Sequence, residues 1–267
     1  MHRTDYEALD AGTVAAALGR LADTFSLTFL AECDSTNSRL AAHAGPVDER
    51  IPVLGADVQT AGRGRRGRVW QSWPGASLTF SLAWRFAPGS PAPAGLSLVA
   101  GLAVARALQG LGVEGVQLKW PNDVLIHGRK LAGILIELSS GGGGGVLAVI
   151  GIGINRHLPA DAKVDSSLGV IDLAECLASP PGPNALLAAV LVELHHLLSV
   201  YADAGFEVLK GAWEQLNAFA DLPVRILGEA EDITGDCVGV DQDGALLLRT
   251  ETGLQRILSG DVSLRVA

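Results

Sequence analysis

The chain has 267 residues, of which 48% are hydrophobic and 18% charged, and its formal net charge is −9. This length and composition allow one sizeable hydrophobic core with a small appended domain, and they exclude a disordered protein. The net acidity argues against a general nucleic-acid-binding protein, because such proteins usually carry a basic face.

The first half of the chain alternates helices and strands. Apolar residues at helical spacing predict a helix up to about Asp23, and alternation predicts a strand over 27–31. The N-cap residues of the segment Asp34-Ser35-Thr36-Asn37 predict a helix over 38–43. The rest of this half is expected to contain strands over 52–59, 77–86 and 116–120, a core helix over 93–111, and a loop over 60–75.

The second half begins with a hairpin and ends in a β-rich tail. Strands over 124–126 and 131–138 flank a turn at His127-Gly128, and a further strand covers 146–154 after a glycine connector at 141–145. A polar stretch at 156–169 precedes helices over 184–202 and 206–219. From Leu222 onward, short β runs separated by turn signals predict a small β-barrel, so we place a domain boundary near Asp221.

Cysteine usage and apolar runs indicate the compartment. Cys33, Cys176 and Cys237 lie far apart and fit neither a disulfide framework nor Cys-x-x-Cys metal spacing. The first ten residues lack the apolar region of a signal peptide. The longest apolar run, 93–111, is interrupted by polar residues, which predicts a buried helix rather than a membrane span. We therefore expect a cytoplasmic protein without a membrane segment.

The segment Gly62-Arg63-Gly64-Arg65-Arg66-Gly67-Arg68-Val69-Trp70, called the arginine loop below, predicts an anion site. No Asp or Glu occurs between Val58 and Val113, so its four arginines have no acidic neighbours in sequence. Glycine lets a backbone approach a ligand, and arginine offers paired donors to phosphate and carboxylate oxygens. The loop also matches the dinucleotide pattern G-x-G-x-x-G, but no helix can start after it and no acid follows at the required distance. A solvated surface loop is the remaining alternative.

Three further segments place polar groups at the ends of apolar strands. They are Lys119-Trp120-Pro121-Asn122-Asp123, Arg129-Lys130-Leu131-Ala132-Gly133 and Gly151-Ile152-Gly153-Ile154-Asn155. Taken singly, Asp123 is typical of a turn, Asn155 of a strand end and Lys130 of an exposed hairpin. A buried charge is unfavourable unless it meets a partner, so together the three segments predict one site.

Ser35-Thr36-Asn37, GRGRRGRVW, KWPND, RKLAGILIE and GIGIN, in this order, resemble the biotin protein ligases, also called biotin–[acetyl-CoA-carboxylase] ligases. The resemblance implies an α+β fold. Residues 1–221 would form the catalytic domain, a mixed sheet with flanking helices of the class II synthetase-like kind, and residues 222–267 an SH3-like β-barrel. It implies formation of biotinyl-5'-AMP from biotin and ATP, then transfer of biotin to a lysine of a biotin carboxyl carrier protein. ATP with Mg²⁺ and biotin are then substrates, and no tightly bound prosthetic group is expected.

The resemblance also implies residue roles. Lys130, Arg65 and Asp123 would be catalytic. The biotin-binding set would be Ser35, Thr36, Asn37, Gln59, Gly62, Arg63, Gly64, Arg65, Lys130 and Gly133. The adenylate-binding set would be Arg63, Arg65, Arg68, Trp70, Lys119, Asn122, Lys130 and Asn155. Asp123 would either position Mg²⁺–ATP or deprotonate the acceptor lysine, and Trp70 would stack on adenine or serve as a core aromatic. No metal-ligand set is assigned.

Two other functions compete with this interpretation. A lipoate– or octanoate–protein ligase has a similar catalytic domain, but the transferase version needs a placed cysteine nucleophile, and no cysteine here sits in a motif. A DNA-binding regulator is disfavoured by acidity and because 34 residues before Ser35 are too few for a winged helix-turn-helix. We expect no nucleic-acid or membrane partner, and the resemblance allows a homodimer.

Overall fold

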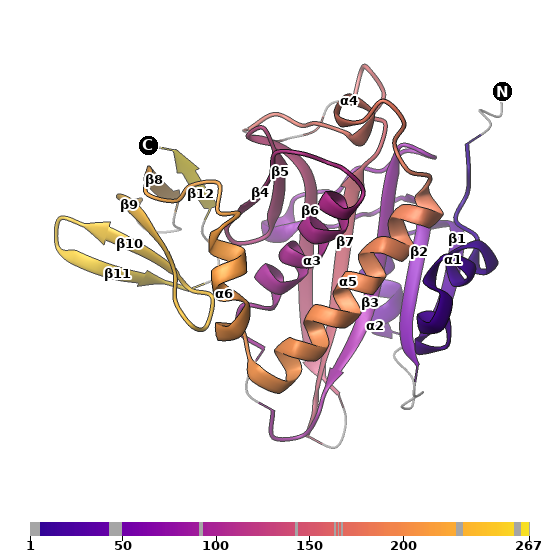
Figure 1. Ribbon diagram of the computed structural model, residues 1–267, viewed down its shortest axis with the longest axis horizontal. Coiled ribbons are helices and arrows are strands. Elements are labelled where there is room, and N and C mark those ends of the chain that lie inside the picture. Colours follow the sequence, from indigo (N-terminus) through magenta and orange to yellow (C-terminus); the bar gives the residue numbers. More distant parts are fainter. Residues whose placement is uncertain are drawn as a thin grey trace.

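A seven-stranded mixed sheet forms the centre of the computed structural model, which describes residues 6–42, 50–90, 93–141, 144–162, 164, 166, 168–227, 232–258 and 263–266 (Figure 1). Its strand order is β1-β2-β3-β7-β6-β5-β4, and only β1 and β2 run parallel. The strands are β1 (Phe25–Cys33), β2 (Ile51–Gln59), β3 (Ser77–Phe86), β4 (Val116–Lys119), β5 (Asp123–Ile126), β6 (Arg129–Ser140) and β7 (Val146–Asn155).

The helices cover the sheet unequally. They are α1 (Ala11–Leu18), α2 (Thr36–Ala42), α3 (Leu96–Gly110), α4 (Leu173–Cys176), α5 (Pro183–Ala204) and α6 (Glu207–Glu214), with a 3₁₀ helix at Gly19–Thr24. The long helices α3 and α5 pack on each other and lie across one face of the sheet (Figure 1). The short helix α2 packs on β2, β3 and β7.

Strand alternation gives the two faces of the sheet different chemistry. Along β3, Leu78, Phe80 and Leu82 belong to the main hydrophobic core, whereas the intervening Thr79 and Ser81 are buried polar residues. Along β7, isoleucines at 150, 152 and 154 enter the same core, and glycines at 151 and 153 alternate with them. Because successive side chains of a strand point to opposite faces, the face away from α3 and α5 carries small and polar residues. That face has room for a ligand.

The C-terminal segment forms a five-stranded antiparallel sheet beside β4 and α6 (Figure 1). Its strands are β8 (Pro223–Leu227), β9 (Ile233–Val240), β10 (Leu246–Thr250), β11 (Gly253–Ile257) and β12 (Ser263–Val266), in the order β11-β10-β9-β8-β12. The edge strands β11 and β12 do not pair within the described residues, so the sheet is not a closed barrel there.

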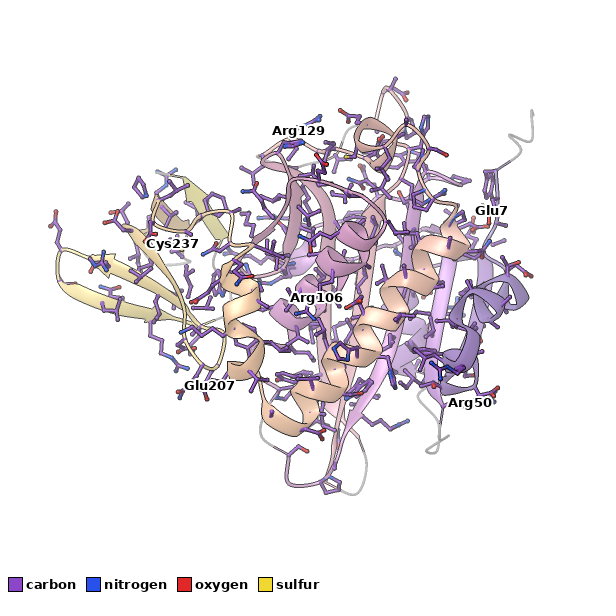
Figure 2. All side chains as sticks on the ribbon, in the orientation of Figure 1. Glu7, Arg50, Arg106, Arg129, Glu207 and Cys237 are labelled. Atoms are coloured by element: carbon purple, nitrogen blue, oxygen red, sulfur yellow. The ribbon has the colours of Figure 1, made fainter. Side chains whose placement is uncertain are left out.

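The C-terminal sheet shares the main hydrophobic core. Val224, Ile226 and Leu246 belong to the same buried cluster as α3 and β3, and Cys237, labelled in Figure 2, lies in it too. Fully buried Trp120 donates its indole N–H to the Gly244 carbonyl at 3.1 Å. The sheet is therefore held to the main domain by both packing and a buried hydrogen bond.

The elements follow the sequence-based expectation, with differences at their ends. The helix expected over 38–43 begins at Thr36, because the Ser35 hydroxyl accepts from the Ser38 N–H at 3.4 Å and marks the start. Its expected end at 43, and positions 142 and 143 of the glycine connector, lie outside the described residues. The helix expected over 206–219 ends at Glu214, and α4, which Asp172 caps through the Glu175 N–H, was not predicted.

Two apolar helices bear on the expectation of no membrane segment. The run at 93–111 forms α3, most of which is buried as predicted. The helix α5 has the length and apolar composition of a membrane-crossing segment, but half of its most apolar window is buried inside the protein. It packs on α3 and α1, which is the environment of a core helix.

Candidate active site

One cavity of about 350 Å³ gathers nearly all the residues that the sequence singled out. It lies on the small, polar face of the sheet, between the start of α2, the arginine loop and the ends of β5, β6 and β7. Its lining includes Ser35, Thr36, Asn37, Gln59, Arg63, Gly64, Arg65, Arg68, Trp70, Asn122, Asp123, Lys130, Gly133 and Asn155. Gly62 and Lys119 do not line it: Gly62 lies in the base of the loop, and Lys119 lies behind Asp123.

One end of the cavity is a row of hydrogen-bonding side chains. The Gln59 Oε1 accepts from the Thr36 N–H at 2.7 Å and lies 3.0 Å from the Thr36 hydroxyl. The Ser81 hydroxyl lies 2.7 Å from the Thr36 Oγ1 and 2.5 Å from the Asn37 Oδ1. Ser81 was not predicted as a site residue, although its polar side chain within an apolar strand was the available signal. This end offers acceptor oxygens.

Two glycines of β7 make space for two predicted site residues. A Cβ on Gly151 would lie 2.2 Å from the Asn37 Oδ1, and a Cβ on Gly153 would lie 2.2 Å from the Trp70 ring. Gly133 of β6 pairs with Gly153, and its Cβ would be 3.4 Å from the same ring. The pattern Gly-x-Gly therefore leaves space for a carboxamide and an indole, side by side, on one face of the sheet.

Trp70 lies in the cavity and not in the hydrophobic core. Its ring rests over Gly133 and Gly153, and the main core cluster does not include it. Its indole N–H is buried and has no hydrogen-bond partner within the described part of the chain. An unpartnered buried donor is unusual and identifies a position where a ligand acceptor would be stabilised.

The arginine loop is a short hairpin. The Gly64 N–H donates to the Arg68 carbonyl at 2.7 Å, and the Trp70 N–H to the Gly62 carbonyl at 2.9 Å. A Cβ on Gly62 would lie 2.3 Å from the Trp70 carbonyl oxygen, so only glycine permits this approach. The loop thereby aims the Trp70 ring back into the cavity.

Although the loop arginines have no acidic neighbour in sequence, Arg63 has an acidic partner from a distant strand. Its Nη2 lies 2.6 Å from the Glu137 Oε2, an acid on β6 that is 74 positions away in sequence. Arg65 Nη1 donates to the Asn122 Oδ1 at 3.4 Å. Arg66 and Arg68 are exposed and pair with no acid in the described ranges. The loop therefore presents a net positive charge at the mouth of the cavity.

At the other end of the cavity, the largely buried carboxylate of Asp123 holds Lys130 in the lining and Lys119 behind it. Asp123 Oδ1 lies 2.5 Å from the Lys130 Nζ, and its Oδ2 lies 3.5 Å from the Lys119 Nζ. Burial raises the pKa of Asp123, but the two ammonium groups outweigh burial, so the pKa lies below its ordinary value. Two cations against one carboxylate leave one net positive charge, which favours an anion beside Lys130.

Asparagines fix the surroundings of this cluster. Asn122 Nδ2 donates to the Ile134 carbonyl at 2.7 Å, which turns its Oδ1 toward Arg65. Asn155 Nδ2 donates to the Ile171 carbonyl at 3.1 Å, so its carboxamide ties β7 to the following segment as well as lining the cavity. Within the residues that the structure describes, no group of three His, Cys, Asp or Glu side chains could hold a metal ion.

Comparison with known proteins agrees with this geometry. The Biotin/lipoate A/B protein ligase family matches residues 33–155, and the Biotin protein ligase C terminal domain matches residues 223–265. The chain is 38% identical to the Bifunctional ligase/repressor BirA of Escherichia coli (strain K12), over 94% of this chain and 77% of that protein. It is 37% identical to a Biotin–[acetyl-CoA-carboxylase] ligase of Paracoccus denitrificans, over 87% of this chain and 98% of that protein.

A solved structure extends the similarity to the whole fold. The biotin protein ligase from Aquifex aeolicus in complex with biotin and ATP superposes with a TM-score of 0.78 at 33% identity, covering 91% of this chain and 99% of that one. The sequence matches and the shared fold together span both the cavity and the C-terminal sheet, and the chain therefore belongs to the biotin protein ligase family.

Proposed function

We propose that the cavity carries out the two-step reaction of a biotin protein ligase. The chain forms biotinyl-5'-AMP from biotin and ATP, releases pyrophosphate, and transfers biotin to a lysine of a carrier protein. The observation that carries the proposal is the layout of one cavity: a row of hydrogen-bonding side chains at one end and Lys130, held by Asp123, at the other, under an arginine loop. A cyclic urea joined to a carboxylate by a short chain requires those two ends.

Ser35, Thr36, Asn37 and Gln59 are assigned to the biotin head. The ureido group has N–H donors and a carbonyl acceptor, so its site needs both kinds of partner. The Gln59 and Asn37 oxygens supply acceptors, and the Ser35 hydroxyl, which accepts from the Ser38 N–H and lines the cavity, supplies a donor. The Gln59, Thr36 and Asn37 side chains are fixed by hydrogen bonds to one another or to Ser81 before a ligand arrives, which lowers the entropy cost of binding.

Lys130 is assigned to the reacting centre. When the biotin carboxylate oxygen attacks the α-phosphorus of ATP, a C–O–P linkage forms, the bond to the β-phosphate oxygen breaks, and negative charge grows on the phosphoryl oxygens. A fixed ammonium group at that position stabilises the charge, and Arg63, Arg65 and Arg68 are within the same cavity. ATP enters as its Mg²⁺ complex, and Trp70 offers a ring face for adenine.

Asp123 is assigned to holding Lys130 in place. Its two oxygens already contact the Lys130 and Lys119 ammonium groups, and its lowered pKa makes it a weak base at neutral pH. These contacts favour a positioning role over deprotonation of the acceptor lysine. Lys119 then acts from behind the cavity wall, through Asp123.

We further propose two units with a boundary at Asp221, the catalytic domain over 1–221 and the C-terminal domain over 222–267. The two family models match separate ranges, residues 33–155 and 223–265, and these ranges support the division. The family acts on biotin carboxyl carrier proteins of carboxylases. For this chain we propose a cytoplasmic location, no binding of operator DNA, and a homodimer. Gel-shift and light-scattering measurements test the last two statements.

The octanoyltransferase alternative is poorly supported by the cysteines. No cysteine occurs in the described lining of the cavity. Burial raises the pKa of the Cys33, Cys176 and Cys237 thiols, which lowers the thiolate population that a nucleophile needs.

The function is tested by biotin transfer to a defined lysine. The protein, ATP, Mg²⁺ and biotin are incubated with a biotin carboxyl carrier domain, and intact mass is measured. We expect one biotin per carrier domain, none on a carrier whose acceptor lysine is changed to arginine, and none without ATP. Absence of transfer to the unmodified carrier under these conditions contradicts the assignment.

A further inference from the structure

Glu137 of β6 contacts both the start of α2 and the arginine loop. Its Oε2 accepts from the Asn37 Nδ2 at 2.9 Å and from the Arg63 Nη2 at 2.6 Å. Asn37 lies at the buried start of α2, and Arg63 lies in the arginine loop. One oxygen atom of a partly exposed acid therefore connects the floor of the cavity to the loop above it.

The contact with Glu137 fixes which way the Asn37 carboxamide points. Its Nδ2 donates to the Glu137 carboxylate and, at 3.3 Å, to the Leu135 carbonyl, so both of its hydrogens are used. Its Oδ1 must then face Ser81. The opposite orientation would place a carbonyl oxygen against a carboxylate and a second carbonyl, which is repulsive.

This orientation determines how many hydrogens are available for hydrogen bonds along the row of polar side chains that Asn37 ends. Four oxygens, on Gln59, Thr36, Ser81 and Asn37, lie 3.0, 2.7 and 2.5 Å apart in succession. Gln59 is also fixed, because its Oε1 accepts from the Thr36 N–H. Both ends of the row are then acceptors, and the two hydroxyl groups between them bring only two hydrogens for three contacts. A row short of hydrogens presents free lone pairs to the cavity and favours a ligand with N–H donors.

We propose that Glu137 is a positioning residue for biotin recognition. It sets the acceptor orientation of Asn37 toward the ureido N–H groups and, through the same oxygen, holds Arg63 so that the loop stays over the cavity in the free protein. The proposal rests on the function assigned above. A purely structural role for Glu137 would affect stability and both substrates alike, whereas a positioning role affects biotin selectively.

The test is the variant Glu137→Gln, which keeps the size of the side chain and removes its charge. We expect the KM for biotin to rise about tenfold, in line with loss of a charge-assisted hydrogen bond that is partly exposed, and the KM for ATP to change about twofold or less. In the ligand-free protein, amide hydrogen exchange over 62–68 should accelerate. Asp232→Asn, which removes an acid from an exposed ion pair with Arg225 at 3.8 Å, is the matched control and should change neither quantity.

A double-mutant cycle separates the two contacts of Glu137. In an Arg63→Gln background, Glu137→Gln should no longer change exchange in the loop but should still raise the KM for biotin through Asn37. The role of Glu137 is overturned if the single variant, with an unchanged thermal midpoint, shows the wild-type KM for biotin, or if both KM values rise equally. Absence of biotin-dependent pyrophosphate release by the wild-type protein would instead overturn the assigned function, and the recognition role with it.

Discussion

Adding one methyl group at Gly153 or at Gly151 should damage different substrate interactions, although the glycines are two positions apart on one strand. A Cβ at Gly153 would lie 2.2 Å from the Trp70 ring, and a Cβ at Gly151 would lie 2.2 Å from the Asn37 Oδ1. Neither separation is sterically allowed, so Trp70 must move in Gly153→Ala and Asn37 must move in Gly151→Ala.

The expected magnitudes follow from what each side chain loses. Base–aromatic stacking is worth about 1–3 kcal/mol, so Gly153→Ala should raise the KM for ATP roughly 5- to 150-fold. Trp70 is only half-buried and can turn outward, so the free energy of unfolding should fall little. Asn37 is 3% exposed and hydrogen-bonded on both sides, so Gly151→Ala should raise the KM for biotin over a similar range and destabilise the fold by about 1–3 kcal/mol.

Steady-state pyrophosphate release, with each substrate varied in turn, measures both KM values. The control is Gly211→Ala in α6, where a Cβ would meet no atom within 4 Å. It should leave both KM values unchanged and stabilise the protein by about 0.5–1 kcal/mol, since alanine is the better helix former. The reasoning is refuted if Gly151→Ala and Gly153→Ala raise the two KM values in the same proportion, or if neither variant changes them.

Three further changes probe the lysine cluster and the C-terminal sheet. Lys130→Ala should abolish biotin-dependent pyrophosphate release without unfolding the protein; substantial residual release would remove Lys130 from the reacting centre. The pKa of Asp123 is lowered in the folded state, so its stabilisation is complete above the unfolded-state pKa of about 3.9 and is lost as the pH falls through the lower folded-state pKa. Asp123→Asn should therefore reduce the free energy of unfolding by about 3–5 kcal/mol at pH 7, and by progressively less as the pH falls below about 3.9; a deficit independent of pH in urea titrations would contradict this. Ending the chain after Asp221 removes Val224 and Leu246 from the shared core, so solubility, adenylation and transfer should all decline; a soluble truncated protein active in both steps would show the sheet to be dispensable.

Much of the fold and the membership of the site could be predicted because they depend on local patterns. The strands predicted over 77–86 and 146–154 are β3 and β7, and the charged segments that interrupt apolar strands all reach one cavity. The strand ends converge there because neighbouring strands bring those positions together, as in the pairing of Asp123 with Gly133.

Contacts set by sheet register could not be predicted. Glu137 meets Arg63 only because β6 lies two strands from β3 and the loop folds back over it. Ser81 joins the polar row because it is paired with Gly151, directly beneath Asn37. The sequence pattern Gly-x-Gly of β7 could not identify which side chains approach it. Likewise, only the structure shows that Lys119 contacts Asp123 and lies outside the cavity lining.

Biotin-dependent pyrophosphate release is the most direct measurement of what the cavity does. Purified protein with ATP and Mg²⁺ should release pyrophosphate when biotin is added, and far less when lipoate or octanoate replaces it, because neither acid carries the ureido group that the polar row fits. The same incubation should yield biotinyl-5'-AMP by mass spectrometry. Equal or greater release with lipoate, or no release with biotin, would contradict the central claim that this cavity activates biotin.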